Sequence, residues 1–408
     1  MARLRILGMI LAGGKGDRLF PLTKARSKPA VPFAGKHRII DFVLSNFINS
    51  SIYAVYILVQ YKSQSLIEHL RSTWRWRIAG GLKGTFITTV PPQQRLGESW
   101  YQGTADAVYQ NLNLIRDLRP DLVAVFGADH IYRMDLNQMV AFHRDNQADV
   151  TVAALPVPLA AASSFGVIAV DSSQRIIGFE EKPKNPKPMP TDPERAYSSM
   201  GNYLFNTDLL IETLLEDSRR STEHDFGRTI LPELFPERRV FAYDFLSNEV
   251  PGVKPYEEQG YWRDVGTLPA YWEAHMDLLG ATPPFDLQNS EWPIFGVIHD
   301  GPPARFGAGE VHDALIGEGC RLEGGRVVRS VLGRGVRIGK GAEVEESILM
   351  DYAEIGAGVK LTRAIVDRYN VIPEGSQMGS DSGSDEQRFF RHPSGLIVLE
   401  RGETRTPV

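Results

Sequence analysis

Three glycines at residues 13–16 follow a short apolar run, and two cations, Arg18 and Lys28, come soon after them. Glycines at the end of a strand let backbone N–H groups approach an anion, because no Cβ stands in the way. Arginine and lysine in the next segment suit a polyphosphate. The spacing matches neither the Walker loop nor the dinucleotide fingerprint. The glycines alone fit a tight strand–helix turn equally well, and the two cations favour phosphate binding.

The elements that must position these residues are read from the hydrophobic pattern. Up to about residue 280, short apolar runs alternate with longer amphipathic ones. Strands are expected at 6–11, 54–60, 122–126 and 150–155, and helices at 41–51 and 105–118. This alternation predicts an α/β domain with a mostly parallel sheet covered by helices. Such sheets bind ligands in the crevice at the carboxyl ends of their strands.

The alternation stops near residue 280, and a proline-rich linker is expected at 281–303. Beyond it, aliphatic residues recur in steps of 6, 6 and 5, which is a 17-residue period, at Leu332, Ile338, Val344, Leu349, Ile355, Leu361, Val366 and Ile372. A six-residue step is too short for helix pairs and suits stacked coils with three short sides. A run of glycine-rich loops does not account for eight aliphatics in register. We therefore predict a parallel β-solenoid at 304–380 and a C-terminal tail at 381–408.

Composition excludes several classes of function. The 408 residues include 45 Lys and Arg against 50 Asp and Glu, a net charge of −5, which argues against nucleic-acid binding by bulk charge. Cys320 is the only cysteine, so an intramolecular disulfide and a multi-thiolate zinc site are excluded. No apolar run approaches the ~18 residues that span a bilayer, and the first one leads into the glycine loop instead of a signal cleavage site. We expect a soluble, cytoplasmic protein with no nucleic-acid or membrane partner.

The segment from Leu11 to Pro32 resembles the opening motif of sugar-phosphate nucleotidyltransferases, and its continuation to Asp41 is similar to bacterial glucose-1-phosphate adenylyltransferases (ADP-glucose pyrophosphorylases). Further motifs support the resemblance together, although none would do so alone: Gln93-Gln94-Arg95, Trp100 to Ala107, Gly127 to Tyr132, Phe179 to Pro183, Ser199 to Gly201, His224 to Gly227 and Tyr261 to Gly266. The resemblance implies a Rossmann-like nucleotidyltransferase domain at 1–280 and a left-handed parallel β-helix of hexapeptide repeats at 304–380.

The implied reaction converts ATP and glucose 1-phosphate to ADP-glucose and pyrophosphate, the committed step of bacterial glycogen synthesis. Its nucleophile is a phosphate oxygen of the sugar phosphate, which is already anionic at neutral pH. No general base is therefore required. The protein must align this oxygen with the α-phosphorus and neutralise the charge on the attacked and leaving groups.

The expected cofactor is Mg²⁺, which prefers one or two carboxylates plus phosphate oxygens. The resemblance implies that Asp129 is catalytic and that it binds the metal together with Asp264. A lone aspartate after a strand is more often a helix N-cap or a turn residue. The position of Asp129 between Gly127 and His130, with a matched partner in Asp264, favours metal binding.

The resemblance also implies roles in substrate binding. Arg18 grips the β- and γ-phosphates with help from Lys28, and both are catalytic. Lys182 binds the sugar 1-phosphate, while Glu181 accepts hydrogen bonds from glucose hydroxyls. From the residues alone, Glu181 and Lys182 would be a solvated ion pair. Further positions matched to the substrate site are Gly13, Gly14, Gln94, Tyr101, Gly103, Gly166, Ser199 and Asp264.

Regulation and assembly are expected from the same resemblance. Gln60 and Trp100 match positions linked to communication between regulatory and substrate sites, although Trp100 could equally be a packing residue. The family is usually homotetrameric and responds to small-molecule allosteric effectors. A lysine that helps to bind the activator in enteric-type enzymes is replaced here by Ala25, so the identity of the activator is open.

Three alternatives remain at this point. A sister enzyme would use another nucleoside triphosphate or sugar, but the 93–107 and 261–266 motifs favour adenylyl transfer. A non-catalytic regulatory subunit of the same fold would typically lose a catalytic cation or carboxylate, and this chain retains them. Acyl transfer by the solenoid would need a catalytic histidine, whereas His312 precedes the clear repeats and His392 follows them.

Overall fold

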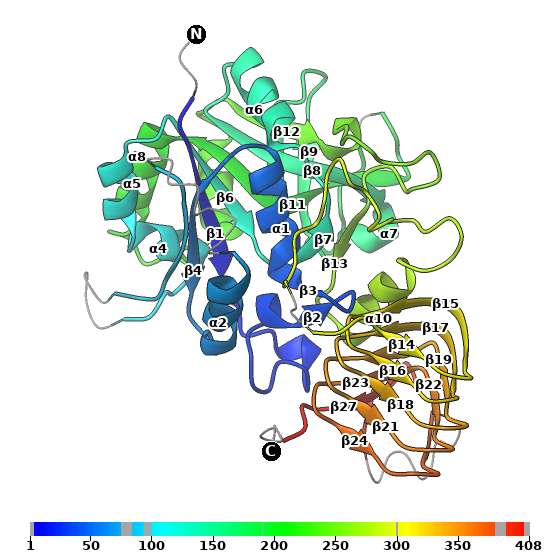
Figure 1. The fold of residues 1–408 in the computed structure, drawn as a ribbon. Coiled ribbons are helices and arrows are strands. Elements are labelled where there is room, and N and C mark those ends of the chain that lie inside the picture. Colours follow the sequence, from blue (N-terminus) through cyan, green and yellow to red (C-terminus); the bar gives the residue numbers. More distant parts are fainter. Residues whose placement is uncertain are drawn as a thin grey trace.

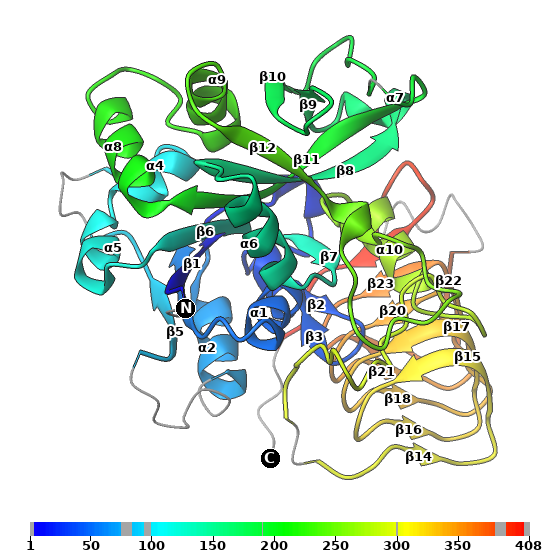
Figure 2. The ribbon, with the colours of Figure 1, turned by 90° about the horizontal axis from the view of Figure 1, so that it is seen from above.

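The computed structural model describes residues 4–74, 84–93, 99–189, 191–298, 301–379 and 389–403. An α/β part formed by the first two thirds of the chain lies beside a stack of coils formed by the last third (Figures 1 and 2). No helix in these described ranges is long and apolar enough to cross a membrane.

A twisted sheet forms the centre of the α/β part. Within the described residues it has nine strands in the order β10-β9-β11-β6-β1-β4-β5, with β8 beside β11 and β12 beside β8. The strands are β1 (Ile6–Ala12), β4 (Ala54–Val59), β5 (Phe86–Val90), β6 (Leu122–Gly127), β8 (Val150–Pro158), β9 (Gly166–Val170), β10 (Ile176–Glu181), β11 (Arg195–Asn206) and β12 (Val240–Asp244). Strands β6, β1, β4 and β5 are parallel, while β11 runs antiparallel to β6, β8 and β9. The predicted α/β class is confirmed.

Helices cover both faces of the sheet, which explains why its central strands are apolar throughout. Alternate residues of β1 point to opposite faces: Ile10 and Ala12 pack in one buried cluster with α1, α2 and α6. Leu7 and Met9 pack in a second cluster with α4, α5 and α8. These helices are α1 (Ile39–Asn49), α2 (Gln64–Thr73), α4 (Thr104–Tyr109), α5 (Leu112–Leu118), α6 (Leu136–Asp145) and α8 (Thr207–Asp217).

The prediction of one continuous helix at 105–118 is wrong, because the structure has two helices there: α4 ends at Tyr109 and α5 begins at Leu112. Asn111 leaves the helical conformation between them, with φ −115° and ψ 19°. Its side-chain amide donates to the Ala107 carbonyl at 2.8 Å and to the Tyr101 hydroxyl at 2.9 Å. Asparagine offers the backbone such local alternatives to a helix.

The stack of coils confirms the predicted β-solenoid. Parallel pairing joins Ile338 to Ile355 and Ile355 to Ile372, which reproduces the 17-residue period. One sheet holds β14 (Arg305–Phe306), β16 (Arg321–Leu322), β18 (Arg337–Ile338), β21 (Glu354–Ile355) and β24 (Val371–Ile372). The other holds β15 (Glu310–Ile316), β17 (Arg326–Leu332), β19 (Glu343–Glu345), β20 (Ile348–Leu349), β22 (Lys360–Thr362), β23 (Ala364–Val366), β25 (Gln377–Met378), β26 (Phe390–Arg391) and β27 (Ile397–Leu399).

A shared apolar core joins the two parts. It contains Leu19, Phe33 and Tyr271 from the α/β part together with Ile348 and Ile365 from the solenoid. Helix α10 (Leu268–Met276) supplies Tyr271 and lies between the sheet and the coils in both views (Figures 1 and 2).

The segment expected as a linker is packed onto the α/β part. The backbone N–H of Phe295 donates to the Ser45 hydroxyl at 2.9 Å, and the Asn49 amide donates to the Pro293 carbonyl at 3.0 Å. Both partners lie on α1. These bonds hold the segment before the solenoid against the α/β part.

Candidate active site

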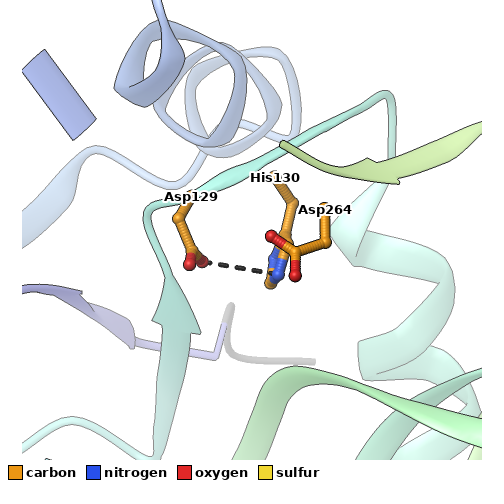
Figure 3. Close-up of side chains that lie close together, drawn as sticks. All are labelled: Asp129, His130 and Asp264. Atoms are coloured by element: carbon orange, nitrogen blue, oxygen red, sulfur yellow. Dashed lines mark ion pairs between the residues drawn. The ribbon is translucent and has the colours of Figure 1, made fainter. Parts of the chain in front are cut away.

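Two aspartates far apart in the sequence meet at the carboxyl end of β6. Asp129 lies two residues beyond the end of that strand, and the short strand β7 (His130–Tyr132) begins directly after it. Strand β13 (Trp262–Asp264) pairs antiparallel with β7, and its register sets Asp264 opposite His130. The side chains of Asp129, His130 and Asp264 converge on one space (Figure 3). The pairing of β13 with β7 therefore brings Asp264 close to Asp129.

Lys28 joins the two carboxylates. Its ammonium nitrogen lies 3.0 Å from Asp129 Oδ2 and 2.8 Å from Asp264 Oδ1, and its side chain is buried. Burial lowers the pKa of Lys28, but the charges of Asp129 and Asp264 outweigh it, so the pKa lies above its ordinary value. Lys28 therefore stays an ammonium at neutral pH and neutralises part of the carboxylate charge.

Asp129 is ionised for a related reason. Burial raises the pKa of its carboxyl, but the neighbouring His130 and then Lys28 hold the pKa well below its usual range. His130 Nε2 lies 3.4 Å from Asp129 Oδ1, and the imidazole packs on the Trp262 ring with a centroid distance of 4.7 Å. Its Nδ1 is buried and has no hydrogen-bond partner among the described residues.

The carboxylates and the imidazole fit a divalent metal. One ligand atom from each of Asp129, His130 and Asp264 lies within 4.8 Å of the others. Paired carboxylates suit a hard cation that also takes phosphate oxygens. Two of these residues are the metal ligands predicted from the sequence, and His130 is a third candidate that the sequence reasoning did not assign.

Arg18 reaches the same space from the loop after β1. It sits in the 3₁₀ helix η1 (Asp17–Leu19), and its Nη2 lies 3.9 Å from Asp264 Oδ2. A Cβ at residue 266 would come within 2.9 Å of that nitrogen, so Gly266 leaves room for the guanidinium. The Arg18 side chain is about two-thirds exposed and therefore accessible to a ligand.

Gly13 and Gly14 form the beginning of this loop. A Cβ on Gly14 would meet nothing within 4 Å, and one on Gly13 would meet only the Gln60 side chain and backbone, at 3.4 Å and 4.0 Å, among the described atoms. The protein's own packing therefore leaves space on this side of the loop. Such space is what a phosphate needs to approach the backbone N–H groups.

A second group of predicted residues gathers on β9, β10 and β11. Glu181 ends β10, and a Cβ at Gly166 would lie 2.8 Å from its Oε2, so the glycine makes room for the carboxylate. Lys182 follows with φ +51° and holds its Nζ 3.7 Å from Glu181 Oε1. Ser199 lies on β11, and its hydroxyl accepts a hydrogen bond from Gly201 N at 3.3 Å.

Gly103 has a structural reason to be glycine. A Cβ there would lie 2.2 Å from the His224 carbonyl oxygen, which accepts a hydrogen bond from Ala105 N at 2.8 Å. Next to it, the Asp225 carboxylate accepts from the Thr104 hydroxyl at 2.9 Å. The start of α4 is thus fixed against the 224–225 segment. Asp225 therefore positions the start of α4, a role that its sequence motif does not predict.

The residues expected to communicate with a regulatory site lie around Tyr101. The Gln60 amide donates to the Tyr101 carbonyl at 3.3 Å. Trp100 is more than half exposed and lies nearly parallel to Tyr61, with centroids 6.4 Å apart. Trp100 is therefore not a core packing residue. Gln94, a predicted substrate-binding residue, lies outside the described residues, while Gln93 donates to the Pro91 carbonyl at 2.8 Å.

Comparisons with known proteins show the family to which the chain belongs. Residues 7–280 match the family described as "Nucleotidyl transferase", and residues 302–399 match "GlmU-like, C-terminal hexapeptide". A protein of Thermodesulfovibrio yellowstonii named glucose-1-phosphate adenylyltransferase is 52% identical over 398 residues, which cover 97% of this chain and 96% of that protein. The chain belongs to the glucose-1-phosphate adenylyltransferase family.

Other members of this family are similar along the whole chain. The Anaeromyxobacter sp. protein of the same name is 48% identical, with 97% of this chain and 98% of the relative covered. A Vibrio vulnificus protein named glucose-1-phosphate adenylyltransferase 1 is 46% identical with the same coverage. The solenoid of this family member is accordingly a left-handed parallel β-helix of hexapeptide repeats, as predicted.

Proposed function

We propose that this chain transfers the adenylyl group of ATP to glucose 1-phosphate, releasing pyrophosphate and forming the ADP-glucose used for bacterial glycogen synthesis. The observation that carries the proposal is the Lys28 ammonium shared by Asp129 and Asp264 at the carboxyl edge of the sheet. One ammonium balances only one of the two carboxylates, so the cluster keeps a net negative charge that can hold the divalent cation a triphosphate substrate requires. The names of the relatives support the choice of substrates.

The roles of the residues follow from the charges of the reaction. The sugar phosphate oxygen attacks as an anion, so the site needs positioning and neutralisation and no base. Arg18 is accessible and binds the β- and γ-phosphates, where negative charge grows as pyrophosphate leaves. Lys182 and Ser199 bind the phosphate of the sugar, and Glu181 accepts from its hydroxyls.

Mg²⁺ is the proposed cofactor, held by Asp129 and Asp264. When bound, it would supply Lewis-acid stabilisation of charge on the phosphate oxygens. Lys28 holds the two carboxylates in one place, and His130 keeps its ring against Trp262 beside them. These contacts preorganise the site, so that little reorganisation is needed when ATP binds.

We also propose that an anionic effector binds where the two parts meet. The Arg26 side chain is buried there, with Nη2 2.5 Å from Asp367 Oδ2, and its Nε and Nη1 have no partner among the described residues. The buried Nε of Arg368 likewise lacks one there. Burial, then Arg368 and Arg26, lower the pKa of Arg38 to about 9. An anion would relieve the mutual repulsion of these guanidinium groups.

A homotetramer and a cytoplasmic location remain predictions.

The experiment is pyrophosphate release by the purified chain with Mg²⁺, glucose 1-phosphate and each nucleoside triphosphate in turn. ATP is expected to be the preferred substrate. A clear preference for UTP would contradict adenylyl transfer. No release with any nucleotide would favour a non-catalytic regulatory subunit, although the presence of Arg18, Lys28, Asp129 and Lys182 argues against it.

A further inference from the structure

The segment between Gly14 and Lys28 touches the opposite end of the chain. The rings of Phe20 and Phe390 meet edge to face, with centroids 6.0 Å apart and an interplanar angle of 85°. Figure 1 shows the red C-terminal end of the solenoid beside the blue segment that follows β1. Phe20 lies only two residues after Arg18, the residue proposed to bind the triphosphate.

An ion pair forms a second contact between the same two segments. Lys24 Nζ lies 2.6 Å from Glu400 Oε2. Phe390 begins β26 and Glu400 directly follows β27, so both contacts come from the C-terminal hairpin, which we define as residues 389–403. The two contacts lie between Arg18 and Lys28 in the sequence.

The solenoid fixes the C-terminal hairpin. Strand β27 pairs in parallel with β23, and the hairpin is closed by antiparallel pairing of β26 with β27. The Asn370 side chain donates to the Glu400 carbonyl at 2.8 Å, and Asp367 N donates to the Leu399 carbonyl at 3.1 Å. These contacts therefore fix the backbone on either side of Phe390 and Glu400 relative to the solenoid.

Arg18 has little support of its own. Its side chain is 68% exposed, and its one ion pair in the described part of the chain is 3.9 Å long, beyond hydrogen-bond distance. Its position depends on the backbone of the segment that carries it. Phe20 N donates to the Asp17 carbonyl at 3.1 Å, so Arg18 and Phe20 belong to one tight turn.

Neither phenylalanine belongs to a buried core, because Phe20 is 48% exposed and Phe390 is 40% exposed. Their rings nevertheless contact each other edge to face, so this pair links the two segments at the surface. We infer that the C-terminal hairpin positions the triphosphate-binding segment, with Phe390 and Glu400 as positioning residues. This inference rests on the proposed function, because it takes Arg18 to bind the triphosphate.

The test compares Phe390→Ala with Phe306→Ala in the full-length chain. Phe306 is a matched control because it is an exposed phenylalanine on the first solenoid strand, β14. The Phe390 variant should lose about two- to tenfold in kcat/KM for ATP, the range expected for one aromatic pair. Its KM for glucose 1-phosphate should change less than twofold. Phe390→Tyr should restore the value for ATP, and the control should match the parent.

Two further measurements separate positioning from a general loss of stability. Phe20→Ala should lose as much as Phe390→Ala, and the double variant should lose no more than either, because both remove the same contact. Exchanging the charges with Lys24→Glu and Glu400→Lys should recover more activity than either single change retains. Additive losses, or equal increases in KM for both substrates, would overturn the inference.

The outcome also distinguishes this inference from the proposed function. Arg18→Ala tests the triphosphate role directly. If that variant binds ATP poorly while Phe390→Ala behaves like the Phe306 control, the role of the C-terminal hairpin is wrong and the function stands. If Arg18→Ala has normal kinetics for ATP, the role assigned to Arg18 is wrong and this inference fails with it. The proposed function fails only if the parent chain releases no pyrophosphate from ATP and glucose 1-phosphate.

Discussion

Replacing Asp129 by asparagine removes one negative charge from the candidate active site and keeps the shape of the side chain. In the described residues the carboxylate contacts Lys28 at 3.0 Å and His130 at 3.4 Å, and it caps no helix. Lys28 also contacts Asp264 at 2.8 Å, and we expect the variant to keep this contact. The fold should therefore survive, because no buried ammonium is left without a carboxylate.

The expected effect on catalysis is large. A metal held by two carboxylates would lose one charged ligand, and loss of such stabilisation costs about 3–5 kcal/mol in the transition state. At about 1.4 kcal/mol per factor of ten, kcat should fall by roughly 10²- to 4 × 10³-fold. The assay is pyrophosphate release at saturating ATP and glucose 1-phosphate, with thermal unfolding measured on the same preparation.

A matched control is Asp145→Asn, since Asp145 is exposed at the end of α6. It should have the turnover of the parent protein. Near-normal turnover of Asp129→Asn with an unchanged melting temperature would refute the metal role. A melting temperature that falls together with activity would instead make Asp129 a structural residue.

The remaining predictions concern the sugar side and stability. Lys182→Ala should raise the KM for glucose 1-phosphate about 10- to 100-fold, because a charge-assisted contact is lost, and a change confined to the KM for ATP would contradict its role. Gly103→Ala should destabilise the fold by about 1–3 kcal/mol in urea unfolding, since the new Cβ would lie 2.2 Å from the His224 carbonyl oxygen; unchanged stability would rule out that close approach. Burial lowers the pKa of His275 to about 3, and its Nε2 accepts from Ala34 N while its Nδ1 donates to the Tyr271 carbonyl, as a neutral imidazole can. In the unfolded chain a histidine has a pKa of about 6.5, so between pH 6.5 and 3 the unfolded state binds more protons than the folded state and the free energy of unfolding should fall as the pH drops. His275→Gln should flatten this dependence on pH. An equally steep curve for the variant would show that His275 is not its cause.

Much of the architecture follows from local pattern. The 17-residue recurrence of aliphatics predicts the solenoid, because each coil repeats the same inward positions, and Ile338, Ile355 and Ile372 do pair in register. Short apolar runs predict the central strands, since a strand covered by helices on both sides must be apolar on both faces. The glycines and cations that follow the first of these runs likewise predict an anion-binding loop, because their residue types alone carry that chemistry.

The tertiary structure alone decided which distant residues meet. Lys28 lies 101 residues from Asp129 and 236 from Asp264, and nothing in the local sequence says that one ammonium serves both. The antiparallel register of β7 and β13 sets His130 opposite Asp264. Periodicity reports which face of an element is buried, whereas pairing between elements depends on packing across the whole fold. For the same reason, no local pattern in the sequence predicts that Phe20 contacts Phe390.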